Sequence, residues 1–311
     1  MSAIVAGTAA PAPTAARRPK GGLWRAILHN RKAMLGAFLL LLFILLAAFP
    51  QLFVPGLHGD PRAIGDLPLE HPSGKHWLGT TGLGQDVYAE LIYSTRESLV
   101  IAVVAGLGAT FLSVIIGVSA AYLGGYADDA LSMLTDVFLV LPTFPLIIVL
   151  ATYAGKGNLT VIVVVLILTG WSYGARQMRA QALSLRNRDF LESARVRGER
   201  QSYIIVVEML PTMISLIVAN FLGAALYAVL TAAGLQFLGL GDPNSLSWGT
   251  MLYWAQNQGA LVNGLPAWAL SPGLAVALLG VSFALLNYAF DEISNPALRP
   301  VRRRRAKSAH S

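Results

Sequence analysis

Four residues with metal-binding side chains lie close together in one polar stretch of the chain: His58, Glu70, His71 and His76. Imidazole and carboxylate groups are suitable ligands for nickel and similar ions. The chain has no cysteine, which excludes disulfides, zinc–thiolate sites and thiol nucleophiles. Because a polar loop accumulates histidine and acidic residues without holding a metal, an ordinary loop is favoured over a metal site.

Motifs for phosphate chemistry and hydrolysis are absent from the sequence. Lys75 and Lys156 each follow a glycine, but neither is followed by the Ser or Thr that completes a phosphate-binding loop. We therefore expect that this chain does not hydrolyse ATP and binds no cofactor. A membrane-embedded enzyme would need a nucleophile and a base, or metal ligands, at one depth. The apolar segments contain no Ser–His, His–Glu or paired-carboxylate set of this kind.

Several polar side chains lie in or beside long apolar blocks: Asp136, Asn220, Tyr227 and Gln236. Lipid offers no hydrogen-bonding partner, so polar groups inside a bilayer must face protein or water. Asn220, Tyr227 and Gln236 are therefore candidates to line a path for a polar solute. Hydrogen bonding between packed helices explains each of them equally well, and both interpretations stay open.

The charged stretch over residues 188–211 has the pattern of a short helix that ends abruptly. Asp189, followed three residues later by Glu192, resembles a capping box at a helix start. Gly198 suits a left-handed stop, a conformation that a residue with a Cβ adopts at some cost. The pattern therefore predicts a helix of about two turns over residues 190–197.

That predicted helix carries two kinds of side chain. Its charged residues hold it at the membrane surface. Four apolar residues offer a small footprint: Phe190, Leu191, Ala194 and Val196. A second helical run over about residues 200–210 leads to Pro211, which can open or bend the membrane helix that follows. A short rigid helix suits a knob that transmits force to a cytosolic partner, while an ordinary interfacial loop explains the charge equally well.

The segments that must position these residues are those of a membrane protein. Of 311 residues, 55% are apolar and only 13% are charged, too few charges to cover a soluble domain of this size. The apolar residues form blocks of about 18 or more, enough to cross a hydrocarbon layer of about 30 Å as helix. We predict an all-α polytopic fold with six transmembrane helices. They cover about residues 33–54, 98–123, 130–153, 159–176, 212–235 and 270–290.

These spans divide the chain into five parts. The parts are a cytoplasmic tail with an interfacial segment (1–32), a first transmembrane helix (33–54), an extracytoplasmic loop (55–95), a five-helix core with a cytoplasmic loop at about 177–210 (96–293), and a basic cytoplasmic tail (294–311).

The placement of basic residues orients the predicted helices. Of 23 Lys and Arg, 19 lie before the first apolar block, between Arg176 and Arg200, or after Asn295. Basic residues concentrate on the cytoplasmic side of membrane proteins, so both termini and the 177–208 loop are predicted to be cytoplasmic. The net charge of +7 is therefore assigned to membrane orientation and lipid contact. Because no basic stripe is interleaved with aromatic residues, we expect no nucleic-acid partner.

The 188–211 stretch resembles the cytoplasmic EAA loop of binding-protein-dependent ABC importer permeases. Its pattern is a Glu with two small residues, a Gly four positions later and a Leu-Pro further on. This sequence supplies Glu192-Ser193-Ala194, Gly198 and Leu210-Pro211, with Ser193 in place of the usual Ala. Glu208 stands near the end of the pattern, where the dipeptide, oligopeptide and nickel branch of the family often has His.

Other segments resemble the same branch in order and spacing. They are HWLGTTGLGQDVYAELIYSTRESL (76–99), DVFLVLPTFPLIIVLA (136–151), GLQFLGLGDPNSLSWGTML (234–252) and NYAFDEISNPALR (287–299). An amino-terminal anchor followed by five core helices resembles the "C" type of the permease pair and the type I ABC importer core.

This resemblance implies a set of partners. They are a homologous second permease, two cytosolic ATPases that carry ATP and Mg, and an extracytoplasmic substrate-binding protein. It also implies that the loop containing Asp189, Glu192 and Gly198 couples the permease to those ATPases in the cell membrane. Peptides are the expected solute, with oligosaccharides or nickel as alternatives. A passive channel or membrane scaffold is the alternative of another class, and the coupling loop disfavours it.

Overall fold

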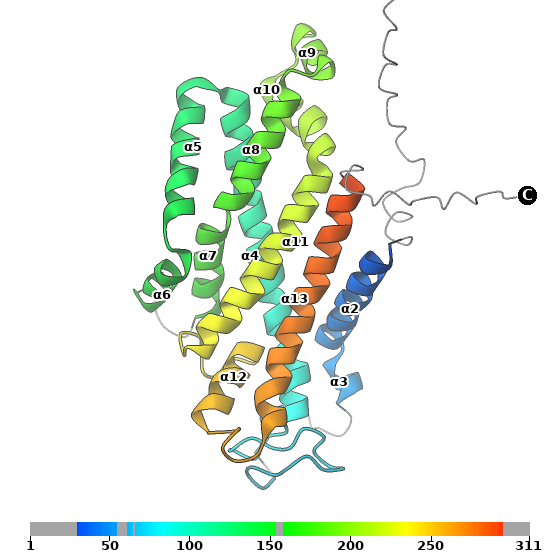
Figure 1. Cartoon of the computed structure of the whole chain (residues 1–311), viewed down its shortest axis with the longest axis vertical. Helices are drawn as coiled ribbons and strands as arrows, with labels where there is room; N and C mark the ends of the chain where they lie inside the picture. The colour runs from blue at the N-terminus through cyan, green and yellow to red at the C-terminus, as the bar shows by residue number, and fades with distance from the viewer. Residues whose placement is uncertain (1–29, 55–60, 65, 154–157, 295–311) are drawn as a thin grey trace, which may run out of the picture.

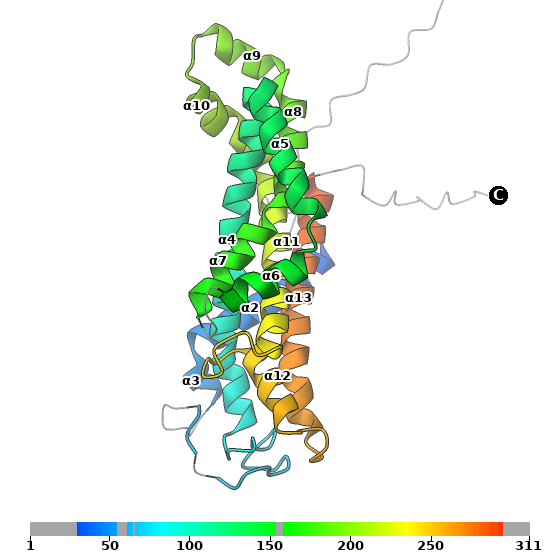
Figure 2. The same ribbon diagram turned by 90° about the vertical axis from the view of Figure 1, so that its left-hand side faces the viewer.

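The computed structural model describes residues 30–54, 61–64, 66–153 and 158–294, with side chains described up to residue 290 in the last range. Within these ranges the chain is helical, with one isolated bridge between Thr80 and Asp86. The helices form an elongated bundle (Figures 1 and 2), with α9 at one end and the 61–86 loop at the other. The prediction of an all-α fold is confirmed.

The helices follow one another along the chain with these bounds: α2 Arg31–Ala48, α3 Pro50–Phe53, α4 Val87–Leu123, α5 Gly125–Val140, α6 Thr143–Tyr153, α7 Leu159–Gly170, α8 Ser172–Arg186, α9 Asp189–Val196, α10 Gln201–Tyr203, the π-helix η1 Ile204–Met209, α11 Leu210–Phe237, α12 Trp248–Asn257 and α13 Pro266–Ser294.

Four described segments are long and apolar enough to cross a membrane: Arg31–Ala48, Val87–Leu123, Gln201–Phe237 and Pro266–Phe290. Two bent pairs, α5 with α6 and α7 with α8, raise the number to six if each pair crosses once. The prediction of continuous helices over 130–153 and 159–176 is wrong, because these pairs bend by 90° and 40°.

The sharper bend follows from a proline. Pro142 has no N–H and disfavours helical backbone in the residue before it. Leu141 accordingly has an extended conformation, with φ −63° and ψ 135°, and α5 ends there. The milder bend lies at Trp171, whose carbonyl accepts a hydrogen bond from the Ser113 hydroxyl at 2.7 Å. A side chain from another helix therefore binds the backbone at the bend.

The predicted loop over residues 55–95 ends earlier than expected, because α4 begins at Val87 rather than near Ser98. Asp86 caps this helix, and its side chain accepts a hydrogen bond from the Ala89 N–H at 2.8 Å. The helix has 37 residues, a length of about 55 Å at 1.5 Å per residue. This exceeds a hydrocarbon layer of about 30 Å, so part of α4 must project beyond it.

The centre of the bundle is α4, which packs against α2, α7, α8 and α11. Its backbone approaches its neighbours closely at two glycines. A Cβ on Gly106 would lie 3.0 Å from the Ala225 Cα of α11, and a Cβ on Gly117 would lie 2.3 Å from the Ala175 carbonyl oxygen of α8. Small residues at such contacts let membrane helices pack backbone to backbone.

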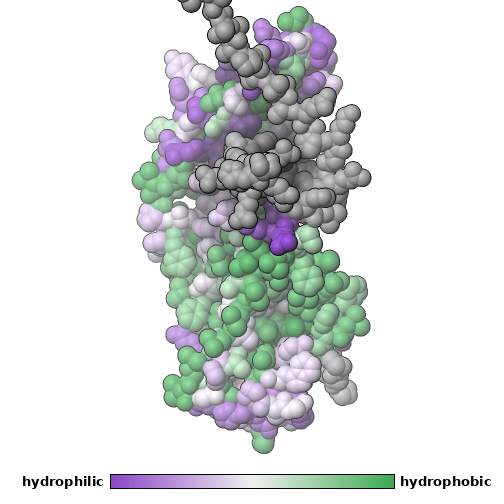
Figure 3. Space-filling view, turned by 45° about the vertical axis from the view of Figure 1, so that its right-hand side comes forward, coloured by the Kyte–Doolittle hydropathy of each residue, from purple (hydrophilic) through white to green (hydrophobic). Residues whose placement is uncertain are grey.

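The outer surface of the bundle is apolar over its middle. Figure 3 shows hydrophobic residues gathered there, with more polar residues toward the two ends. Large side chains such as Phe38 of α2 and Leu274 of α13 are 62% and 61% exposed. A soluble monomer rarely exposes so large an apolar patch. This surface is suited to contact with lipid or with another membrane-spanning chain.

Ion pairs join α5 to α8 near the α9 end of the bundle. The Arg179 guanidinium donates to both carboxylate oxygens of Asp128, at 2.6 and 2.7 Å. Arg176 pairs with Asp136 further along the same two helices. Asp136, which the sequence placed beside an apolar block, is therefore a partner in helix packing.

The close contact at Gly117 gives a first test of this packing. Gly117→Ala places a Cβ against backbone that cannot move without shifting α8, so we expect a destabilisation of about 1–3 kcal/mol and a lower unfolding temperature in detergent. Gly273→Ala in α13 is the control, because its nearest neighbouring atom would be 3.9 Å away. Equal unfolding temperatures for the two variants would contradict the close α4–α8 packing.

Candidate functional site

The connection between α8 and α11 projects from one end of the bundle as α9 (Figures 1 and 2). This helix begins after Arg188, which has extended backbone and provides no side-chain cap. The predicted capping box at Asp189 and Glu192 is therefore wrong. Asp189 is already inside the helix, so its carboxylate does not occupy the capping position. Both acids lie in the first turn, where negative charge interacts favourably with the helix dipole.

The other end of α9 has the expected left-handed stop. Gly198 has a φ of +76°. The Gly198 N–H donates to the Arg195 carbonyl at 2.9 Å, and the Glu199 N–H donates to the Ala194 carbonyl at 3.2 Å. This pair of bonds is the Schellman motif, which satisfies carbonyls at a helix end. No atom lies within 4 Å of a Cβ built on Gly198, so the backbone conformation alone favours glycine here.

The apolar residues of α9 divide between two faces. Leu191 and Ala194 are fully buried, in a cluster that includes Ile204 and Met209 of η1. Phe190 is 38% exposed and Val196 is 84% exposed. The prediction of a single four-residue footprint is therefore wrong. Residues three apart lie on one helical face, so Leu191 and Ala194 fasten α9 to the bundle while Val196 points outward.

The exposed face of α9 is mixed in character. Glu192 and Ser193 are exposed, and the Ser193 hydroxyl donates to the Asp189 carbonyl within the helix at 2.8 Å. Arg195 lies over the Tyr122 ring of α4, 5.6 Å from its centre. Glu192, Arg195 and Val196 line one surface depression together with Asn187. This face is free to contact another protein.

The predicted second helical run is interrupted by a π-helix. A short α10 leads into η1, and α11 starts at Leu210 with Pro211 in its first turn. Proline cannot donate the backbone hydrogen bond that a continuous α-helix needs, and π-helical turns disturb the regular ladder. The Thr212 hydroxyl donates to the Met209 carbonyl at 2.7 Å. The junction before α11 therefore joins two differently bonded helices.

A cavity of about 470 Å³ lies between the bent pairs, α11 and α13. Two of the three predicted path residues, Asn220 and Tyr227, line it. Asn220 also donates to the Thr110 hydroxyl of α4 at 3.1 Å, so it bonds two helices while facing the cavity. Gln236 does not line this cavity; it is buried near the other end of α11.

Further polar residues line the same cavity, among them Thr169, Gln177 and Asn287. None was among the predicted path residues. Asn287 interrupts the apolar run FALLNYAF, so the rule that selected Asn220 would also have found it. Thr169 and Gln177 lie on either side of the Trp171 bend, whose effect on side-chain direction is not visible in the sequence.

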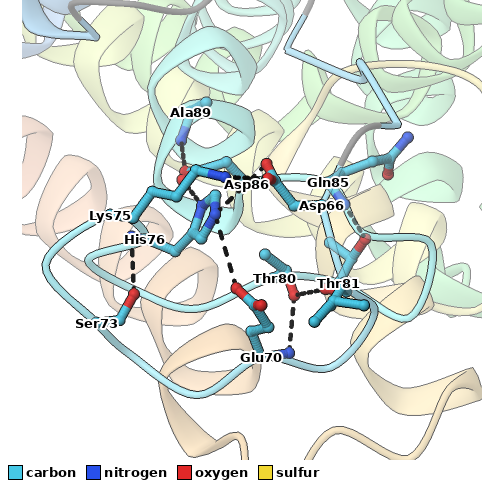
Figure 4. Close-up of polar contacts among 11 residues, drawn as sticks. Asp66, Glu70, Ser73, Lys75, His76, Thr80, Thr81, Gln85, Asp86 and Ala89 are labelled. Carbon is cyan, nitrogen blue, oxygen red and sulfur yellow. Dashed lines mark hydrogen bonds and ion pairs between the residues drawn. The ribbon is translucent and has the colours of Figure 1, made fainter.

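The 61–86 loop at the opposite end is held by a polar network around His76 (Figure 4). The His76 ring is buried, and its Nδ1 lies 2.7 Å from Asp86 Oδ2. Its Nε2 lies 3.4 Å from Asp66 and 3.8 Å from Glu70. Lys75 pairs with Asp66 and lowers the pKa of that carboxyl by hydrogen bonding.

The sequence also raised the question of a metal centre in this loop. Among the described residues, no group of three or more His, Asp or Glu side chains is arranged to hold a metal ion. His58, one of the residues considered as a ligand, lies outside the described residues. The described part of the loop places Asp86 to cap α4, which is a structural role for that carboxylate.

Comparison with known proteins identifies the family. Residues 113–299 match the sequence model described as "Binding-protein-dependent transport system inner membrane component". The chain is similar to the oligopeptide transport system permease protein OppC of Mycobacterium tuberculosis, with 32% identity over 90% of this chain and 95% of the relative. It is also similar to the glutathione transport system permease protein GsiD of Pectobacterium atrosepticum, with 31% identity over 91% and 93% of the two chains.

A putative peptide permease protein of Brucella suis is 35% identical over 82% of this chain and 84% of its own length. Among solved structures, a chain from inward-facing MetNI methionine ABC transporter matches with a TM-score of 0.53 and 18% identity. That match covers 68% of this chain and 97% of the other, and it supports the permease fold. The family model, the relatives and the apolar helices together show that this multi-pass membrane protein belongs to the inner-membrane components of binding-protein-dependent transport systems.

Proposed function

We propose that the chain is one of two membrane-spanning subunits of an ATP-driven importer for small peptides. Its relatives include permease proteins named for oligopeptide and glutathione transport. The expected partners are a homologous permease, two cytosolic ATPases that bind ATP and Mg, and an extracytoplasmic binding protein. This chain supplies the path and the coupling helix, and the hydrolytic chemistry belongs to the ATPases.

The observation that carries this proposal is the attachment of α9. Leu191 and Ala194 anchor it to the bundle, while Val196 and the charged face point outward. Because α9 packs on η1, and η1 continues into α11, a force applied to α9 acts directly on a helix that lines the cavity. A cytosolic ATPase that holds the exposed face can therefore move α11.

The cavity lining supports a polar organic solute. Asn220, Gln177 and Asn287 each offer both a donor and an acceptor, and Tyr227 adds a hydroxyl. Peptide groups present both donors and acceptors, so these side chains match them. No His, Asp or Glu is among the described residues that line the cavity. Peptides are therefore favoured over nickel as the solute of this path.

The orientation in the membrane follows from the basic residues. The α9 end is proposed to face the cytoplasm, together with both termini, and the 61–86 loop to face the outside. This places Arg179 and Arg186 of α8, and the basic residues of the connection from α8 to α11, on the cytoplasmic side, as the positive-inside rule requires.

The absence of native cysteine allows a direct test of orientation. We introduce single cysteines at two exposed positions, Leu67 and Tyr126, which are 69% and 95% exposed at opposite ends of the bundle. A membrane-impermeant maleimide applied to intact spheroplasts should label Leu67→Cys, and should label Tyr126→Cys only after permeabilisation. The reverse labelling pattern would invert the proposed topology.

A second test concerns the end of α9. Gly198→Val should strain the left-handed stop by about 1–2 kcal/mol. Transport, and stimulation of ATP hydrolysis by loaded binding protein, should then fall several-fold together in reconstituted vesicles. Gly198→Asn is the matched control, because asparagine tolerates left-handed backbone better, and it should retain most of both activities. Assembly is checked by co-purification, and wild-type transport by assembled Gly198→Val complexes would show that α9 is not the coupling element.

A third test separates a path role of Asn220 from simple helix packing. Asn220→Leu removes a polar group from the cavity as well as the hydrogen bond to Thr110. Thr110→Val removes only that hydrogen bond, because Thr110 does not line the cavity. We expect Asn220→Leu to slow peptide uptake several-fold and Thr110→Val to leave it near wild type. Equal effects of the two variants would mean that Asn220 serves helix packing alone.

A further inference from the structure

A carboxylate is buried without a hydrogen-bond partner at the outer end of α4. Glu90 lies in the first turn of this helix, and the residue is only 4% exposed. No described side chain or backbone group donates a hydrogen bond to its carboxylate. Burial of an ionised carboxylate is unfavourable unless a cationic or hydrogen-bonding partner compensates for the lost water. The charge of the Arg62 guanidinium offsets part of this cost, but the carboxylate still lacks a described hydrogen-bond donor.

Glu90 faces a cavity of about 140 Å³ formed by three separate parts of the chain. The 61–86 loop supplies one wall, the start of α4 another, and the segment from Pro243 to Trp268 the third. Two more buried polar atoms on these walls have no hydrogen-bond partner: Gln258 Oε1 and Trp268 Nε1. Trp268 is 1% exposed. The cavity thus presents two unpaired acceptors and one unpaired donor.

The charges around the cavity restrict what can fill it. Arg62 stands at its edge and donates to the backbone carbonyls of Asn244 and Ser245. Glu90 is the only carboxylate among the described residues that line the cavity, which leaves a metal ion short of ligands, and a simple anion would be repelled by Glu90. A ligand that matches this cavity has a cationic group with several N–H donors, which can bond to Glu90 and Gln258. It also has an acceptor oxygen for the Trp268 N–H.

The size of the cavity fixes how much of a ligand it can enclose. Water occupies about 30 Å³ per molecule in the liquid, so the cavity has room for roughly four or five waters. An ammonium group, one carbon and an adjacent carbonyl fit this space, whereas a whole peptide does not. A longer ligand would have to extend past the rim, where Leu83 is partly exposed.

We propose that this cavity binds the amino end of a peptide at the outer mouth of the permease. The ammonium donates to the Glu90 carboxylate and to Gln258 Oε1, and the first carbonyl accepts from Trp268 Nε1–H. The identification of the ligand as a peptide rests on the proposed transport function. The ammonium-recognition site itself rests on the three unpaired groups. Two residues of this site, Arg62 and Glu90, lie before residues 113–299, the region that the family model matches.

The test uses the full chain purified in lipid nanodiscs without the binding protein, so that no other peptide site contributes. Equilibrium dialysis measures binding of radiolabelled glycinamide, which has an ammonium group beside a carbonyl. Competition with N-acetylglycinamide, which lacks the ammonium, and with methylammonium, which lacks the carbonyl, tests each half of the site. We expect saturable glycinamide binding, with both competitors at least tenfold weaker.

Two variants and one control assign that binding to the cavity. Glu90→Gln should weaken glycinamide binding at least tenfold. Trp268→Phe keeps the apolar ring and removes the N–H, so it should weaken glycinamide but leave methylammonium unchanged. Glu97→Gln is the control, because Glu97 lies on the same helix and lines a different cavity; it should bind glycinamide like the wild type. The Trp268 variant keeps the test valid if Glu90→Gln fails to fold.

Three results would overturn the proposal. They are no glycinamide binding, equal affinity for N-acetylglycinamide, and wild-type affinity in both cavity variants. The first would mean that the cavity holds water only. If glycinamide fails to bind while the reconstituted importer still takes up peptides, the cavity assignment falls and the transport function stands. If glycinamide binds as expected while peptide uptake is absent, the ammonium site stands and the transport function falls.

Discussion

The close approach of helix backbones along α4 is the constraint on which the other features depend. Between helices in a membrane there is little hydrophobic driving force, so contact must come from tight packing and hydrogen bonds. At Gly106 and Gly117 no side chain separates α4 from α11 and α8. Helix α4 thus fixes the position of α11, which lines the cavity, and of α8, which leads to α9. Larger residues at these glycines would push the two apart.

The two ends of α4 also contact the segments that lie at the two ends of the bundle. At one end, Tyr122 lies under Arg195 of α9. At the other, Asp86 caps the helix and contacts His76, and Glu90 faces the outer cavity. Because α4 is about 55 Å long, one helix connects the proposed coupling surface with the proposed outer mouth. The proposed coupling and ammonium sites therefore share a common frame without sharing residues.

Local features of this fold were predictable from sequence, and features that depend on distant contacts were not. The left-handed stop at Gly198 follows from glycine's backbone freedom, and the apolar spans follow from segment length. The bend after Leu141 was also local, since Pro142 signals it, but the apolar run concealed it. By contrast, the division of α9 into buried Leu191 and exposed Val196 depends on where η1 lies.

The outer cavity shows the same limit more strongly. In the sequence, Glu90 lies more than 160 positions before Gln258 and Trp268. Only the folded arrangement brings them to one cavity. The predicted path residues separate for a related reason. Asn220 and Tyr227 are two helical turns apart and face the same cavity. Gln236 instead lies close to Gly241 and Gly249.

These contacts also indicate where motion can occur. At Gly117 the α4 backbone lies directly against α8, with no space for a Cβ. A shift there would therefore require the two helices to separate. The η1–α11 junction already lacks a regular ladder, because Pro211 cannot donate and the preceding turns are π-helical. Bending at this junction therefore breaks fewer favourable contacts than sliding α8 along α4. A force on α9 would accordingly move η1 and the first turns of α11 about residues 204–211, on the Asn220 side of the cavity, while α4 keeps its contacts with α8 and with Ala225 of α11.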